Sequence, residues 1–208
     1  MDVTIIGTGN MARAIGRRVV AGGHRLTVLG KDVEAADAAL GDIGGDGSAK
    51  AGRSGDPIGD EVVVLAVYYP DAMAAVEQYG DGLSGKVLVD ITNPVNETYD
   101  DLVTPPDGSA AQELANASGA RVVKAFNTTF ANTLNEGKVA GQPLDVFLAG
   151  DDDDAKAKVA TLAEDAGLRP VDAGPLRRAR ELEAAGLLHM SVQGTLGAGF
   201  GSALKILA

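Results

Sequence analysis

The sequence predicts a doubly wound α/β fold, and two patterns support this prediction. Over the first ninety residues, short β-rich runs alternate with segments that carry apolar residues at helical spacing. The run 62–67 is apolar at every position, as expected of a parallel strand that is covered on both faces. The composition agrees, because 45% hydrophobic and 23% charged residues in a chain of 208 indicate one globular domain, or one domain with an appendage.

Strands are expected where aliphatic and β-branched residues run together between glycines or turns: residues 3–6, 26–29, 49–51, 62–67, 86–90, 121–126, 145–149 and 168–171. Helices are expected where apolar residues recur every three or four positions: residues 11–20, 33–40, 70–79, 109–117, 151–166, and from 181 to the end of the chain. Gly7 and Gly30 end the first two strands, Gly22-Gly23 ends the first helix, and Pro70 opens the third. The acidic run 151–154 is interpreted as a helix N-terminus rather than a metal site.

Charge and composition exclude several classes of function. The net charge of −11, without any long basic cluster, argues against nucleic acid as a partner. The absence of cysteine excludes disulfides, thiolate metal sites and a cysteine nucleophile. No signal peptide is expected, since a strand begins at residue 2. The uncharged stretch 184–204 contains too many glycine and polar residues for a membrane span, and a buried helix or subunit interface is expected there.

The sequence Gly7-Thr8-Gly9-Asn10-Met11-Ala12 follows a strand and opens a helix. This is the G-x-G-x-x-A form of the dinucleotide-binding fingerprint. Gly7 permits a tight turn, Gly9 lets a pyrophosphate approach the backbone, and Ala12 lets helix and strand pack closely. The helix start offers free N–H groups to the phosphates. A turn with only a structural role is the alternative.

The end of the second strand bears on the choice between NAD and NADP. An acidic residue there would hydrogen-bond the ribose 2′-hydroxyl, whereas this chain has Gly30-Lys31. Lys31 offers a charge for a 2′-phosphate and Gly30 leaves room for it, although Asp32 follows directly. NADP is therefore favoured, and a solvated surface lysine is the alternative.

Motifs for other chemistries are absent, including G-x-S-x-G, the P-loop and H-E-x-x-H. The chain has two histidines, too few for a zinc triad without carboxylate ligands. His24 is expected to be structural, and His189 is expected in the core or at an interface rather than in catalysis.

Segments along the whole chain resemble the F420-dependent NADP reductases, which move hydride between NADPH and the deazaflavin coenzyme F420. The segments that carry the resemblance are Gly7 to Ala12, Val62 to Tyr69, Ile91 to Pro94, Ser109 to Ala111, Val123 to Thr128, Ala149 to Asp153, Gly167 to Pro170 and Asp172 to Leu176. The last three are the most selective. Archaeal members usually carry Ser-Arg where this chain has Gly30-Lys31, and a histidine where it has Asn127.

The resemblance implies a Rossmann-type, mostly parallel sheet of about eight strands, with C-terminal helices that close the acceptor cleft. It also implies a homodimer, and the expected location is the cytoplasm. The domains are expected at 1–142, which would bind NADP, and at 143–208, a C-terminal βαβ extension with helices that would supply the acceptor cleft and dimer contact.

No catalytic acid or base is expected, because hydride transfer between two planar rings depends on positioning and on the exclusion of water. No metal is expected, and the small-molecule partners are NADP and coenzyme F420. The expected acceptor wall consists of Tyr68, Tyr69, Asn127 and Gly194, the last within the segment 192–196. The expected cofactor-binding residues are Gly7, Thr8, Gly9, Asn10, Met11, Ala12, Gly30, Lys31, Val67, Tyr68, Asn93 and Ala125. The alternatives are an NADPH-dependent reductase of a flavin, a metal ion or a small imine, and a dinucleotide sensor without turnover.

Overall fold

The structure, a computed structural model, describes residues 1–44, 47 and 49–207. Its strands are β1 (Asp2–Ile6), β2 (Arg25–Gly30), β3 (Lys50–Arg53), β4 (Val62–Leu65), β5 (Val87–Asp90), β6 (Arg121–Lys124), β7 (Lys138–Val139), β8 (Gln142–Pro143), β9 (Asp145–Gly150) and β10 (Arg169–Gly174). Its α-helices are α1 (Asn10–Ala21), α2 (Val33–Ile43), α3 (Tyr69–Tyr79), α4 (Ala110–Ser118), α5 (Ala131–Glu136), α6 (Asp153–Asp165), α7 (Ala179–Ser191) and α8 (Gln193–Leu196). The 3-10 turns η1 (Gly80–Leu83) and η2 (Leu176–Arg178) complete the elements.

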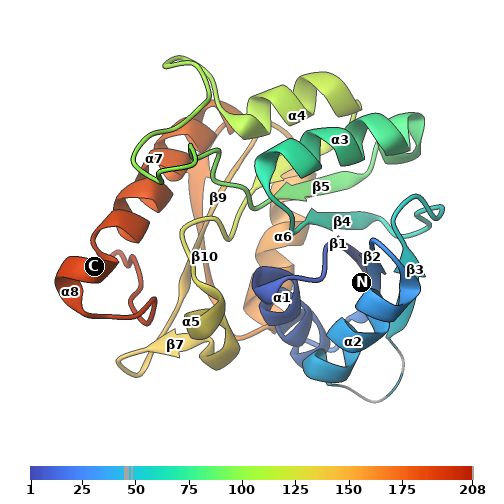
Figure 1. The fold of residues 1–208 in the computed structure, drawn as a ribbon, viewed down its shortest axis with the longest axis horizontal. Helices are drawn as coiled ribbons and strands as arrows, with labels where there is room; N and C mark the ends of the chain where they lie inside the picture. The colour runs from blue at the N-terminus through green and yellow to red at the C-terminus, as the bar shows by residue number, and fades with distance from the viewer. Residues whose placement is uncertain (45–46, 48, 208) are drawn as a thin grey trace.

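The main sheet confirms the predicted fold class. It has eight strands in the order β10-β9-β6-β5-β4-β1-β2-β3 (Figure 1). Every neighbouring pair is parallel except β6 with β9. From β1 the chain winds outward through β2 and β3, and then returns to β4 on the other side of β1. This reversal places a topological switch point between β1 and β4, and ligands of such sheets bind at the carboxyl ends of the strands beside it.

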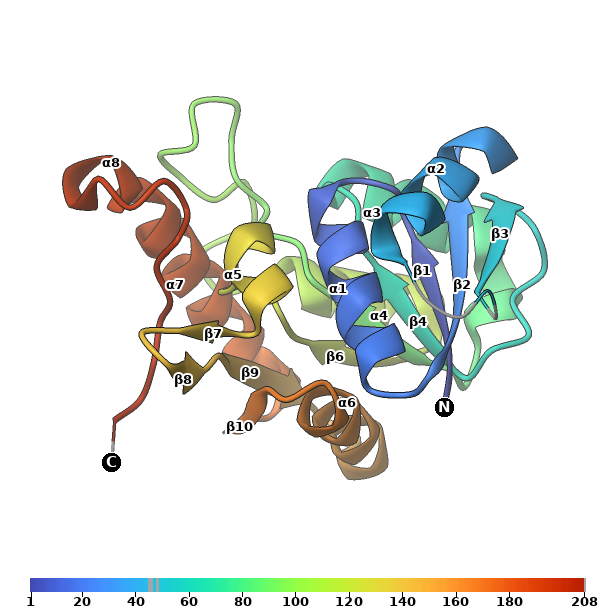
Figure 2. The ribbon, with the colours of Figure 1, turned by 90° about the horizontal axis from the view of Figure 1, so that it is seen from below.

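The helices cover the two faces of the sheet as two layers. Val3 and Ile5 of β1 pack in the core cluster that includes α1, α2 and α6, whereas Val63 and Leu65 of β4 pack in the cluster that includes α3 and α4. Figure 2 shows α1 and α2 in front of β1 and β2, on the viewer's side. The alternation along β1 and β4 follows from the pleat, and it explains why both strands are apolar almost throughout.

The C-terminal part departs from the prediction in three places. Strand β6 ends at Lys124 rather than at residue 126, and Phe126 has a positive φ of 60°. Helix α5 and the β7–β8 hairpin were not predicted, because each is too short to show periodicity. The expectation of helix to the end of the chain is wrong beyond Leu196, where Gly197 and Gly199 both have left-handed backbones.

The chain after α8 runs back past the β7–β8 hairpin (Figure 2). Asp145 anchors this tail, because its buried carboxylate accepts from Lys205 Nζ at 2.7 Å and from the Ile206 N–H at 2.9 Å. Arg169 joins the contact by donating to the same carboxylate at 2.8 Å and 2.5 Å. Among the described residues, no helix has the length and apolar character needed to cross a membrane.

Candidate functional site

The predicted glycine loop joins β1 to α1 at the switch point. Gly7 has a φ of 124°, and a Cβ there would lie 2.3 Å from the carbonyl oxygen of Ala66, so this position requires glycine. Gly9 differs, because its backbone is extended and no atom of the described residues lies within 4 Å of a Cβ built there. Within the same described part, no side chain caps α1. The loop therefore leaves open space in front of helix N–H groups, as a phosphate site requires.

Two other residues of the loop, Thr8 and Ala12, serve packing. Ala12 is 1% exposed and belongs to the core beneath α1, as the fingerprint predicts. Thr8 lies against β2, since its Cγ2 would be 3.1 Å from a Cβ at Gly30. That same Cβ would lie 2.8 Å from the carbonyl oxygen of Asp32. Glycine at position 30 is thus required by local packing, in addition to any room it leaves for a ligand.

The carboxyl ends of β2 and β3 carry two exposed cations. The Asp32 carboxylate accepts from the Ala35 N–H at 2.8 Å and caps α2, which accounts for an acidic residue directly after Lys31. Arg53 is the strand partner of Gly30, so it stands beside Lys31 at this edge. Among the described residues, no carboxylate forms an ion pair with Lys31 or Arg53. In a chain of net charge −11, this pair of exposed cations suits an anionic group.

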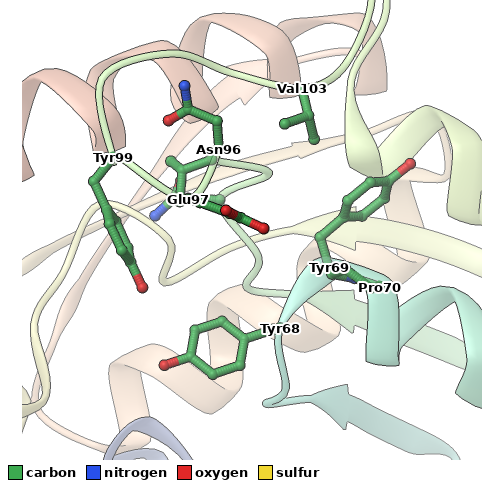
Figure 3. Close-up of a pocket in the computed structure, with 9 residues that line it drawn as sticks. Tyr68, Tyr69, Pro70, Asn96, Glu97, Tyr99 and Val103 are labelled. Atoms are coloured by element: carbon green, nitrogen blue, oxygen red, sulfur yellow. The ribbon is translucent and has the colours of Figure 1, made fainter.

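A cavity of about 570 Å³ opens beyond the carboxyl ends of β4 and β5 (Figure 3). Its lining comes from the start of α3 and from the loop after β5: Tyr68, Tyr69, Pro70, Asn93, Val95, Asn96, Glu97, Tyr99 and Val103. Cavities of this size accommodate cofactor-sized ligands. The predicted residues Tyr68, Tyr69 and Asn93 are thus brought together at one edge of the sheet.

The two adjacent tyrosines play different parts in this cavity. Tyr68 is 73% exposed at the N-cap of α3. Tyr69 is half-buried, and its hydroxyl donates to the Glu113 carboxylate on α4. Burial and this hydrogen bond raise the pKa of Tyr69 to about 12, so the phenol keeps its proton at neutral pH. Tyr69 is therefore a fixed wall, and Tyr68 is the more accessible ring.

Asn93 and Asn127 join the ends of β5 and β6 beside the cavity. Asn127 Nδ2 donates to Asn93 Oδ1 at 2.9 Å and to the Leu182 carbonyl at 2.8 Å, while Asn93 Nδ2 donates to the Asn127 carbonyl at 2.8 Å. These bonds fix both amides. Among the described residues, Asn127 Oδ1 and Thr92 Oγ1 are buried without a hydrogen-bond partner.

Helix α7 approaches Asn93 through Gly186, which sequence reasoning missed. A Cβ at Gly186 would lie 2.5 Å from Asn93 Oδ1, so only glycine allows this approach without a shift. Glycine in a helix interior lowers helix stability by about 1 kcal/mol relative to alanine. Its presence at position 186 therefore indicates that the close approach to Asn93 requires it. The requirement depends on tertiary packing, and the local sequence carries no signal for it.

A buried ion cluster holds α7 against the ends of β5 and β6. Lys124 Nζ donates to Asp90 Oδ2 at 2.7 Å, to Glu183 Oε1 at 2.8 Å and to the Thr92 carbonyl at 2.5 Å. The three charged side chains are fully buried. Burial raises the pKa of Glu183, and Lys124 opposes this rise. Glu183 also accepts from backbone N–H groups at the start of α4, so the cluster joins four elements around the site.

The remaining predicted residues lie around this centre. Val67 follows β4 next to the glycine loop, with its Cγ1 3.1 Å from a Cβ at Gly7. Ala125 is buried, and its N–H donates to the Asp90 carbonyl at 3.0 Å. Gly194 lies exposed in α8, and neither it nor Asn127 is among the described residues that line the cavity. His189 is buried against Phe130, with ring centroids 4.3 Å apart, and burial lowers its pKa.

Comparison with known proteins shows which proteins this chain is similar to. Residues 2–94 match the family model described as NADP oxidoreductase coenzyme F420-dependent. The chain is 31% identical over 203 residues to the F420-dependent NADP reductase of Methanothermobacter thermautotrophicus, which covers 88% of this chain and 85% of that protein.

A solved structure and a longer protein are also similar to this chain. A structure from Arthrobacter sp. FB24, described as a candidate F420-dependent NADP reductase, is similar with a TM-score of 0.88 at 28% identity, over 100% of both chains. The rat metalloreductase STEAP3 is 29% identical over 183 residues, or 88% of this chain. The chain spans only 36% of the length of that metalloreductase.

Proposed function

The chain belongs to the family of F420-dependent NADP reductases, and from this premise we propose that it transfers a hydride between NADP(H) and the deazaflavin coenzyme F420. The proposal rests on one observation: the glycine loop and the tyrosine-lined cavity lie at the same edge of the sheet. Both lie at the carboxyl ends of the strands that flank the switch point. A dinucleotide held by its pyrophosphate at Gly9 would extend along this edge toward the cavity.

The residues present suit NADP. Gly9 leaves space for the pyrophosphate, and the first turn of α1 supplies N–H donors. Lys31 and Arg53, at the carboxyl ends of β2 and β3, offer charge for the 2′-phosphate. Asn93 lines the cavity, and its amide is suited to hydrogen-bond the carboxamide of a nicotinamide ring.

When bound, a dihydronicotinamide would supply a hydride to the deazaflavin, and the proton that completes the reduced deazaflavin would come from water. Hydride transfer needs the two rings in contact and water excluded. Tyr69 is suited to this role as a neutral wall, since its hydroxyl is held by the Glu113 carboxylate. Asn93 is held by Asn127 at one side of the cavity, which limits the movement of a ring placed there. No side chain needs to gain or lose a proton in this step.

An anaerobic absorbance assay tests the proposal. The protein is mixed with NADPH and oxidised F420, and the loss of the deazaflavin absorbance is followed. We expect reduction of F420 in proportion to NADPH consumed, with NADH much less effective. Binding of NADPH without reduction of F420 would contradict the proposal.

A second candidate function is reduction of another acceptor by NADPH. The similarity to a protein named metalloreductase favours it, because the matched part of that protein covers 88% of this chain. Replacing F420 by flavin, ferric ion or a cyclic imine in the same assay separates the two candidates.

We further propose that the protein is a cytoplasmic homodimer that binds small molecules and not nucleic acid. Exposed apolar side chains gather near its C-terminus: Leu188, Leu196, Phe200, Ile206 and Leu207. Their burial between two copies would remove this surface from water. The division into an NADP-binding part, 1–142, and an acceptor and dimer part, 143–208, remains part of this proposal. Light scattering during gel filtration tests the dimer, and a monomer at micromolar concentration would refute it.

A further inference from the structure

The loop after β5 carries an aromatic residue that sequence reasoning did not select. Tyr99 has a φ of 57°, a left-handed conformation that a tyrosine adopts only at a cost of about 1 kcal/mol or more. Its side chain is 52% exposed. Packing in the core explains neither the left-handed backbone of Tyr99 nor the exposure of its ring. Tyr99 lines the cavity described above, and this location provides an explanation.

The loop that presents Tyr99 is a hairpin with its own hydrogen-bonded frame. Val95 and Leu102 form an antiparallel bridge, and the Val103 N–H donates to the Pro94 carbonyl at 2.7 Å. Asn96 organises the tip, because its Oδ1 accepts from the Asp100 N–H at 3.0 Å and its Nδ2 donates to the Asp100 carboxylate at 2.6 Å. The frame fixes the position of the backbone that carries the strained residue.

Tyr99 and Tyr68 reach the cavity from different segments. In Figure 3 the Tyr99 ring extends from the hairpin and the Tyr68 ring from the start of α3, toward the same mouth of the cavity. Only eight aromatic residues occur in the whole chain, four of them tyrosines, and three of those four line this cavity. The concentration of flat side chains here indicates a flat ligand, since aromatic rings gain by stacking on one another.

We propose that Tyr99 determines the preference for a planar acceptor, by stacking with Tyr68 on the aromatic ring system of the deazaflavin at the mouth of the cavity. This inference rests on the proposed function and assigns a specificity-determining residue to its acceptor site. A small imine or a metal ion offers no comparable ring face and would gain little from the pair. The strain at Tyr99 is the cost of placing a side chain where it contacts the acceptor rather than the core.

Binding of oxidised F420, measured by the change in its own fluorescence with saturating NADP⁺ present, tests this role without turnover. Stacking of a heteroaromatic ring on an aromatic side chain predicts that Tyr99→Ala raises the Kd of F420 by about fivefold to tenfold. Tyr99→Phe, which keeps the ring, should stay within about twofold. The Kd of NADPH should not change in either variant, and in turnover the loss should appear in KM for F420 more than in kcat.

Two further variants separate stacking from a structural role. Tyr99→Gly removes the ring and also relieves the left-handed backbone, so it should retain thermal stability while F420 binding weakens as in the alanine variant. Tyr79→Ala is the control, because Tyr79 is the remaining tyrosine of the chain and lies at the C-terminal end of α3, outside the cavity lining. It should leave the Kd of F420 unchanged.

The outcomes are distinct. Unchanged F420 affinity in Tyr99→Ala and Tyr99→Gly, with normal binding by the unmodified protein, overturns the role of Tyr99 and leaves the proposed function intact. An equal loss of NADPH affinity in these variants, or an equal effect of Tyr79→Ala, overturns it as well. Absence of F420 binding by the unmodified protein overturns the proposed function and this inference together.

Discussion

Replacing Gly9 by valine should abolish tight NADPH binding and spare the fold. Gly9 has a φ of −74° and a ψ of −176°, values that any residue adopts, and the space around a Cβ there is open among the described residues. A valine at this position would fill the volume that the pyrophosphate needs. We expect the Kd of NADPH to rise at least tenfold, which corresponds to about 1.4 kcal/mol.

Gly7→Ala provides the contrast. Its φ of 124° and the 2.3 Å approach to the Ala66 carbonyl oxygen mean that an added methyl group distorts the junction of β1 and β4. We expect a loss of several kcal/mol in the free energy of unfolding, from backbone strain and overlap. Gly9→Ala, with its single added carbon, should lie between the unmodified protein and Gly9→Val in NADPH affinity and should unfold normally.

Isothermal titration calorimetry with NADPH and thermal denaturation, run on all three variants, measure the two effects separately. The interpretation holds if Gly9→Val loses affinity with its melting temperature nearly unchanged, and Gly7→Ala loses stability. Normal NADPH affinity in Gly9→Val would refute the assignment of the glycine loop as the pyrophosphate site.

Three other predictions follow from the site. Lys31→Ala should raise the Kd of NADPH about tenfold and leave that of NADH unchanged, and equal losses would show that Lys31 does not recognise the 2′-phosphate. Gly186→Ala should lower kcat/KM about tenfold without unfolding the protein, because the new Cβ displaces Asn93, and unchanged steady-state kinetics would contradict this. Lys124→Met should destabilise the protein by about 3–5 kcal/mol at pH 8, since it leaves Asp90 and Glu183 buried without their cation. Burial raises the pKa of Glu183 in the folded state, so acidification protonates this carboxyl and relieves the penalty. The loss of stability in Lys124→Met, measured by denaturant unfolding, should therefore shrink from pH 8 toward pH 5. A loss that grows on acidification would be inconsistent with the cluster.

The parts of the site that were predictable are those that depend on local sequence. Gly7 and Gly9 stand at fixed offsets between a strand and a helix, and the structure gives each the local environment expected of the fingerprint. The role of Asp32 was ambiguous in the sequence, because an N-cap and a ribose ligand use the same side chain. Its hydrogen bond to the Ala35 N–H shows that it caps α2.

The parts that could not be predicted depend on contacts between distant segments. The requirement for Gly186 arises only because α7 packs on Asn93, more than ninety positions away in the chain. Tyr99 lies in an irregular, proline-containing stretch where no periodicity indicates which way a side chain points. The apolar neighbours of the glycines after Leu196 predict a continuing helix, whereas left-handed backbones at Gly197 and Gly199 end it.

Direct transfer of hydrogen between the two coenzymes is the central claim. NADPH deuterated at one or the other C4 position is incubated with oxidised F420 in ordinary water, and the reduced deazaflavin is examined by mass spectrometry. We predict that deuterium from one of the two labelled forms appears in the reduced F420, and that the other form gives unlabelled product. Reduction without deuterium from either form, or no reduction of F420 by a protein that binds NADPH tightly, would contradict the account.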